Sequence, residues 1–166
     1  MRVLLQRVSR ASVSVEGAVV GSIGPGLTVF VGVAEGDTSE EVVFLAQKMV
    51  GLRIFGGENG KFDLCALDVN AELLLISQFT LFADTKKGRR PSFIGAAESA
   101  VASETFNYFT GQCVASGLKV ATGVFGQHMV IELINDGPVS IWLDTRDYSP
   151  EQIKQHLKLA SSGTGS

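Results

Sequence analysis

Ser77-Gln78-Phe79-Thr80 places three hydrogen-bonding side chains around one aromatic ring, at the end of a predicted buried strand. Backbone amides and hydroxyls at such a strand end could stabilise the oxyanion that forms when an ester or amide is hydrolysed. No base accompanies the segment, and a hydroxyl without a base is a poor nucleophile, so the pattern alone does not make Thr80 catalytic. The alternative interpretation is an ordinary strand end whose hydroxyls are satisfied by hydrogen bonds.

A cluster of basic residues follows closely. Four of the 14 Lys and Arg residues of the chain fall within five positions, at Lys86, Lys87, Arg89 and Arg90. The whole chain has 17 acidic residues and a net charge of −3, so it has no general attraction for nucleic acid. The local cluster therefore predicts a loop that contacts phosphate, and a merely solvated loop remains the alternative.

Gly137-Pro138 lies between two predicted late strands, over residues 128–135 and 139–144. Proline donates no amide hydrogen bond, and about 5–6% of X-Pro bonds in folded proteins are cis. Spacing alone indicates an ordinary turn at this corner.

The histidines and cysteines do not form a recognisable site. His128 and His156 are predicted on separate elements, a late strand and the last helix, so they suggest neither a metal site nor a catalytic triad. Cys65 and Cys113 are far apart and lack CxxC spacing, which excludes a disulfide framework and indicates buried thiols in a reducing compartment. No glycine-rich phosphate-binding motif is present. We therefore expect no metal and no cofactor.

The elements that must position these residues alternate between strands and helices. A chain of 166 residues predicts one domain, and it is long enough to bury a substantial core. Strands outnumber helices, which predicts an α/β fold with a curved, barrel-like mixed sheet flanked by two or three helices. The pattern predicts strands at 2–8, 11–15, 27–33 and 72–77, and helices after Thr38 and at 96–116.

Residues 1–146 are predicted to form this domain, and residues 147–166 a C-terminal helix and tail. Ser149 is the expected N-cap of the helix, with Gln152 three residues later. We expect disorder in the low-complexity stretch 161–166. The first residues do not read as a signal peptide and no apolar run could span a membrane, so we expect a cytoplasmic protein.

In combination, these motifs resemble the D-aminoacyl-tRNA deacylases of bacteria and eukaryotes over residues 1–144. The resemblance implies an enzyme that hydrolyses the ester joining a D-amino acid to tRNA, and that also removes mischarged glycine. It further implies a metal-free homodimer with its active sites at the subunit interface. The motifs that carry it are Ser77-Gln78-Phe79-Thr80-Leu81, Ala83-Asp84-Thr85, Arg90-Pro91-Ser92-Phe93 and Asn135-Asp136-Gly137-Pro138-Val139.

The same resemblance implies roles for individual residues. Ser77 to Thr80 would line the pocket, and Gly137-Pro138 would be cis and would enter the pocket of the neighbouring subunit. Its backbone carbonyls would face the substrate α-amino group and leave no room for an L side chain. Thr80 as a covalent nucleophile competes with oxyanion stabilisation by backbone amides, assisted by the tRNA 2′-hydroxyl. Ser140 stands where the family usually has threonine, which keeps the hydroxyl.

Three other functions remain open on sequence alone. A nucleic-acid-binding module without hydrolase activity would use the basic cluster as its contact surface and would bind in a salt-sensitive way. A small-molecule esterase would use Ser77 to Thr80 without tRNA, although the sequence offers it no base. A structural interaction protein would have an ordinary trans turn at Gly137-Pro138.

Overall fold

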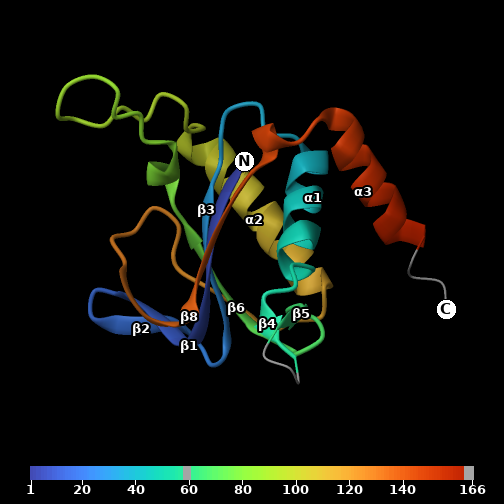
Figure 1. The fold of residues 1–166 in the computed structure, drawn as a ribbon. Helices are drawn as coiled ribbons and strands as arrows, with labels where there is room; N and C mark the ends of the chain where they lie inside the picture. Colours follow the sequence, from blue (N-terminus) through green and yellow to red (C-terminus); the bar gives the residue numbers. More distant parts are fainter. Residues whose placement is uncertain (58–60, 163–166) are drawn as a thin grey trace.

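The computed structural model describes residues 1–57 and 61–162, without the side chains of residues 161 and 162. A curled mixed sheet forms one side of the molecule and α-helices cover its outer face (Figure 1). The elements, in chain order, are β1 (Arg2–Val15), β2 (Ala18–Ile23), β3 (Gly26–Gly32), α1 (Ser39–Val50), β4 (Phe55–Gly56), β5 (Phe62–Leu64), β6 (Glu72–Ser77), the 3₁₀ helix η1 (Phe79–Phe82), α2 (Ser99–Ala115), β7 (Val120–Thr122), β8 (Val130–Asp144), the 3₁₀ helix η2 (Thr145–Asp147) and α3 (Pro150–Ser162).

β1 gives the sheet its curl. Its first half pairs antiparallel with β3 and its second half with β2, while β8 pairs along its other edge. The path continues from β3 to β6 and β7 through parallel pairing. One strand thus serves two neighbours on the same edge, which bends the sheet into the predicted barrel-like form. The predicted α/β fold class is confirmed.

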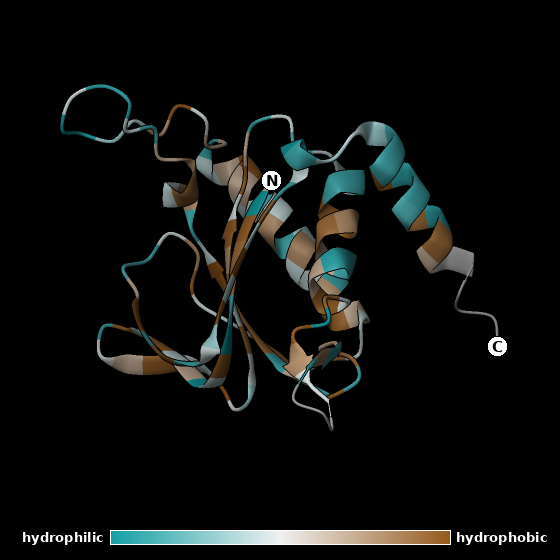
Figure 2. Cartoon of the chain, in the orientation of Figure 1, coloured by the Kyte–Doolittle hydropathy of each residue, from teal (hydrophilic) through white to brown (hydrophobic). Residues whose placement is uncertain are grey.

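β6 lies between β3 and β7, and its residues alternate between two hydrophobic cores. Leu73 and Leu75 pack into the main core, beneath α1 and α2, whereas Leu74 and Ile76 pack into a second cluster inside the curl of the sheet. A strand buried on both faces needs a continuous apolar run, which is why its sequence predicted a central strand. Figure 2 shows the hydrophobic residues concentrated along these central strands.

Two of the predicted helices, α1 and α3, begin at the expected caps, whereas α2, predicted at 96–116, begins at Ser99. Thr38 and Glu41 form the capping box of α1, because the Glu41 carboxylate accepts from the Thr38 amide at 2.8 Å and the Thr38 hydroxyl accepts from the Glu41 amide. Ser149 and Gln152 exchange the equivalent bonds at the start of α3. In the described part of the chain, no helix is long and apolar enough to cross a membrane.

α3 packs on α1, as a helix of the body rather than a free extension. Ile153 reaches the main core, and the rings of Tyr148 and His156 contact Phe44 edge-on at centroid distances of 4.8 and 5.1 Å. Burial lowers the pKa of His156, and the nearby Lys48 charge lowers it further.

The helix includes Ser161 and Ser162, within the stretch expected to be disordered, and the expected disorder of the tail stays a prediction. Packing of the preceding turns on α1 carries the backbone on as helix, although the serines have little helix preference of their own. Residues 163–166 of the expected tail lie outside the described residues.

β8 is one strand of 15 residues where the sequence predicted two. The predicted strand over 128–135 begins instead at Val130, so that His128 lies in the preceding loop. The corner at Gly137-Pro138 lies within β8 and does not end it. The turn residues indicated a break because their local preference opposes a regular strand.

Pairing with β1 overrides that preference. Val8 pairs with Asn135 and Gln6 pairs with Ser140, so β1 holds β8 on both sides of the corner. Only one residue of β1 separates these two pairs, whereas four residues of β8, 136–139, do so. The extra residues bulge away from the ladder.

We predict that Ile153→Ala lowers the free energy of unfolding by about 2–4 kcal/mol, because it leaves a cavity where α3 meets the core. Leu159→Ala, at a side chain of the same helix that is 66% exposed, should change it by less than about 0.5 kcal/mol. Urea unfolding followed by circular dichroism measures both. Equal effects of the two substitutions would show that α3 is not anchored through Ile153.

Candidate active site

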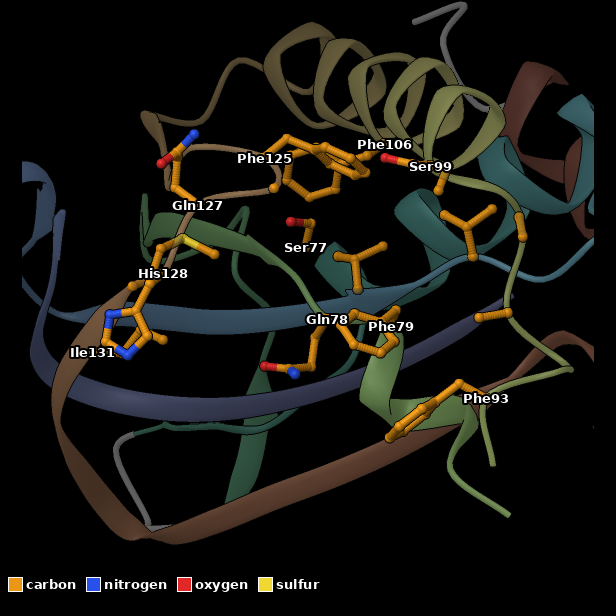
Figure 3. A pocket seen from close by; sticks show the side chains of 17 residues that line it. Ser77, Gln78, Phe79, Phe93, Ser99, Phe106, Phe125, Gln127, His128 and Ile131 are labelled. Atoms are coloured by element: carbon orange, nitrogen blue, oxygen red, sulfur yellow. The ribbon is translucent and has the colours of Figure 1, made fainter. Parts of the chain in front are cut away.

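A cavity of about 590 Å³ opens at the carboxyl end of β6 (Figure 3). It lies between the end of the sheet, η1, the first half of α2 and the loop before β8. Most of its lining is apolar. The residues that line it are Val31, Val33, Ser77, Gln78, Phe79, Phe93, Ala96, Ala97, Ser99, Ala102, Phe106, Phe125, Gly126, Gln127, His128, Met129 and Ile131.

The parallel pairing of β3 with β6 sets the position of the predicted Ser77–Thr80 segment. Val31 pairs with Ser77, and the Gln78 amide donates to the Val31 carbonyl at 2.7 Å. Gly32 lets η1 pack closely, because a Cβ there would lie 3.0 Å from the Phe82 ring and 3.1 Å from the Gln78 carbonyl oxygen. A side chain at this position would push the segment away from β3.

Arg2 anchors η1 from the other side. Its guanidinium donates to the Leu81 carbonyl at 2.7 Å and to the Asp144 carboxylate at 2.9 Å, and lies 4.4 Å from the centroid of the Phe82 ring. One cation therefore joins the start of β1, the end of β8 and η1. These contacts hold the segment after β6 in one place, which a site that works by positioning requires.

The four residues of the segment differ in their placement. Ser77 and Gln78 are half-buried in the cavity wall, and Phe79 stands at its edge, 57% exposed and edge-on to Phe93 at 5.0 Å between ring centroids. Thr80 is exposed and does not line the cavity; its hydroxyl accepts a hydrogen bond from the Gln78 side-chain amide. The structure thus brings Ser77, Gln78 and Phe79 to the cavity and leaves Thr80 beside it.

The opposite wall is the loop between β7 and β8. The Gly123 amide donates to the Leu75 carbonyl at 3.1 Å, so the loop leaves β7 beside the last residues of β6. Met129 occupies the space next to Gly123, where a Cβ would lie only 2.4 Å from its sulfur. Glycine at this position therefore allows Met129 to line the cavity.

The cavity contains little charge. Among its lining residues, all within the described part of the chain, His128 is the one titratable side chain. The described residues as a whole contain no group of three or more His, Cys, Asp and Glu side chains placed to hold a metal ion. Such a site offers hydroxyls, amides and apolar walls, which suit the positioning of an activated ester better than proton transfer by side chains.

The basic cluster lies in an exposed loop outside the cavity. Asp84 and Ser92 close the loop by exchanging backbone hydrogen bonds of 2.7 and 2.9 Å. The loop projects from the side of the molecule opposite α3 (Figure 1). Its basic side chains, Lys86, Lys87, Arg89 and Arg90, are exposed, which both a phosphate-contacting loop and a merely solvated loop require.

Gly137 and Pro138 are exposed, and neither lines the cavity of its own chain. The peptide bond between them is cis, as the resemblance implied. Two side chains hold the bulge that contains them. The Asn135 side chain accepts a hydrogen bond from the Val139 amide at 2.8 Å and donates one to the Val139 carbonyl at 3.2 Å. Arg7 donates to the Asp136 carbonyl at 2.9 Å.

Sequence reasoning missed most of the cavity walls. Phe125 and Met129 were not singled out, and His128 was interpreted as a histidine of a strand. The signal that could have indicated this loop is Gly126, which has a φ of +76° and marks a turn directly before the polar pair Gln127-His128.

Comparison with known proteins defines the class and then the family. A family model described as D-Tyr-tRNA(Tyr) deacylase matches residues 4–144, which makes this chain a hydrolase that deacylates aminoacyl-tRNA. A D-aminoacyl-tRNA deacylase of Dehalococcoides mccartyi is 56% identical over 147 residues, covering 89% of this chain and 96% of the relative. The chain belongs to the D-aminoacyl-tRNA deacylase family. α3 lies beyond the part that the family model matches.

Two solved structures share the fold. The structure titled "c-Myc DNA Unwinding Element Binding Protein" is 36% identical, with a TM-score of 0.81 over 87% of this chain and 98% of that one. A structure described as a probable eukaryotic D-amino acid tRNA deacylase is 18% identical, with a TM-score of 0.76 over 86% of this chain and 98% of that one. The second likeness concerns the fold alone.

We predict that Thr80→Ala keeps D-aminoacyl-tRNA deacylation within about tenfold of the wild-type rate, because the Thr80 hydroxyl lies outside the cavity and has no base beside it. Single-turnover release of the amino acid from charged tRNA measures the rate, and Thr110→Ala on α2 provides a control for mutation of a threonine elsewhere. A loss of about a thousandfold or more would instead make this hydroxyl the nucleophile.

Proposed function

We propose that this enzyme hydrolyses the ester of D-aminoacyl-tRNA and of glycine mischarged on tRNA, with Ser77, Gln78, Phe79 and Thr80 as its catalytic segment. The observation that carries this proposal is the cavity at the end of β6, which the segment borders and in which no acid–base pair of side chains is present among the described lining residues. An aminoacyl ester is already activated, so a positioned water and a stabilised oxyanion suffice for hydrolysis.

Backbone amides at the start of η1 supply the oxyanion donors. The first N–H groups of a helix have no carbonyl partner within the helix, and those of Phe79 and Thr80 hold this position in η1. The 2′-hydroxyl of the terminal ribose assists the attack of water. The reaction needs neither cofactor nor metal in this proposal, and the absence of a metal is supported by the lining, whose described residues offer a single imidazole and neither carboxylate nor thiolate as a metal ligand.

Discrimination between D and L substrates requires a second copy of the chain. Gly137 and Pro138 of one subunit enter the cavity of the other, so that the active sites lie at the interface of a homodimer. Three features support this assignment: the pair is exposed, it is held by Arg7 and Asn135, and it does not line its own cavity. The backbone carbonyls at this corner accept from the substrate ammonium, for which the described lining has no carboxylate.

The wall formed by this corner works by exclusion. An L side chain on the substrate Cα would collide with it, whereas a D side chain points to the opposite side. Glycine has no side chain to collide, so glycyl-tRNA is also accepted. Because the wall excludes one face of Cα and does not read the side chain, the enzyme accepts many D-amino acids.

The basic loop binds the acceptor arm of the tRNA. Lys86, Lys87, Arg89 and Arg90 are exposed on a loop directly before Phe93, which lines the cavity. Phosphates of a tRNA whose 3′ end occupies the cavity would therefore pass close to this loop. We assign the reaction to residues 1–146 and to the cytoplasm, where charged tRNA is used.

Membership of the deacylase family argues against the alternative of a binding module without hydrolase activity, and the second candidate function is therefore DNA binding in addition to hydrolysis. The 36% identical structure titled as a DNA unwinding element binding protein favours it, together with the basic loop. This function predicts salt-sensitive binding of DNA by the protein, alongside release of amino acid from charged tRNA.

We predict that Gly137→Ala lowers the ratio of D-tyrosine to L-tyrosine release by about tenfold or more, equivalent to about 1.4 kcal/mol. At Gly137 φ is +142°, and a Cβ would lie 2.7 Å from Val139 Cγ2 and 3.0 Å from Arg7 Nη2, so the corner must move. Initial rates on tRNA charged with either enantiomer measure the ratio.

Gly117→Ala is the matched control, because Gly117 also has a positive φ, of +85°, but nothing lies within 4 Å of a Cβ there. It should leave the ratio unchanged. An unchanged ratio in the Gly137→Ala protein would show that this corner does not select the enantiomer.

A further inference from the structure

The loop before β8 contains a pair of polar residues, Gln127 and His128, to which the proposed function assigns no role. Both are exposed and both line the cavity. In Figure 3 they lie on one side of the cavity and Phe93 on the other, with Gln78 and Phe79 between them. His128 is therefore an exposed side chain at the border of the cavity.

The backbone fixes this pair in place. The Gln127 amide donates to the Val124 carbonyl at 3.3 Å, and Gly126 takes the positive φ of +76° that closes the turn. The Gly123 amide ties the start of the loop to β6, and Met129 packs beside Gly123 at its end. The imidazole at 128 is thus presented by an ordered loop, which is how a binding residue is usually positioned.

The negatively charged phosphates of a tRNA substrate indicate which group this imidazole could bind. With the aminoacyl group in the apolar interior, as the proposed function requires, the first phosphate of the nucleic acid would lie near the rim. His128 is the one titratable side chain among the described lining residues, and an imidazole N–H donates readily to a phosphate oxygen. The basic loop and the β7–β8 loop both project from the side of the molecule away from α3 (Figure 1).

We propose that His128, supported by Gln127, binds the phosphate that joins the terminal adenosine of the tRNA to the preceding nucleotide. This inference rests on the proposed function, since it places the 3′ end of a tRNA in the cavity. His128 then acts as a substrate-positioning residue, which holds the ester over Ser77 and Gln78 and takes no part in bond making.

Binding of two small probes tests the inference without any hydrolysis. Adenosine 5′-monophosphate carries the phosphate in question and adenosine lacks it. NMR titration of the wild-type protein should give a dissociation constant about fivefold lower for the monophosphate, as expected for one exposed hydrogen bond to a charged group. His128→Ala should abolish this preference and His128→Gln, which keeps a donor, should retain part of it.

The other histidine of the chain is the matched control. His156 lies in α3, where it packs on Phe44 of α1, and it does not line the cavity, so His156→Ala should keep the preference for the monophosphate. A preference that survives His128→Ala, or that is absent from the wild-type protein, would overturn the inference.

Kinetics separate this role from the proposed function. On D-aminoacyl-tRNA, His128→Ala should raise KM about fivefold and leave kcat within about twofold, because the contact is equal in the ground and transition states. A fall in kcat at unchanged KM would contradict a positioning role. A wild-type protein that prefers the monophosphate but releases no amino acid from tRNA would refute the proposed function and leave the phosphate contact standing.

Discussion

The parallel pairing of β6 with β3 on one edge and β7 on the other is the constraint on which the site depends. The two hydrophobic clusters bury both faces of the strand so placed, and its apolar run ends at Ser77, where the chain reaches the cavity. It also brings the loop after β7 to the same end of the sheet. The Ser77–Thr80 segment and the cavity wall that faces it are thus placed by one set of backbone hydrogen bonds, in keeping with the general rule that ligands bind at the carboxyl ends of parallel strands.

The second constraint is the bulge in β8. β1 keeps the strand paired on both sides of residues 136–139, while Asn135 and Arg7 bond the bulge itself. A short stretch of backbone is therefore presented rigidly at the surface, without a side chain large enough to cover it. Such a surface can exclude one enantiomer by shape while supplying carbonyl acceptors, and it needs no titratable group to do so. In our account, this exposed backbone enters the cavity of a second copy of the chain and supplies the carbonyl acceptors for the substrate ammonium that the cavity lining lacks.

Short sequence patterns predicted the features that depend on interactions between neighbouring residues. The capping pairs at Thr38 and Ser149, the end of β6 at Ser77 and the exposed basic loop are all properties of neighbouring residues, and all appear in the structure. The unbroken β8, the position of His128 and the contribution of α2 to the cavity depend on pairing between distant segments. Neither hydrophobic periodicity nor a turn motif reveals pairing between distant segments. The sequence therefore could not predict the walls of the cavity, although it did single out Ser77, Gln78 and Phe79, which line it.

The central claim is that a shaped cavity at the end of β6 accepts one enantiomer of an ester already activated by its attachment to tRNA. The most direct test compares initial rates of release of D-tyrosine and L-tyrosine from the same tRNA by the wild-type protein. The account predicts release of D-tyrosine at least about a hundredfold faster, equivalent to about 2.8 kcal/mol of steric exclusion. Equal rates for the two enantiomers would contradict it.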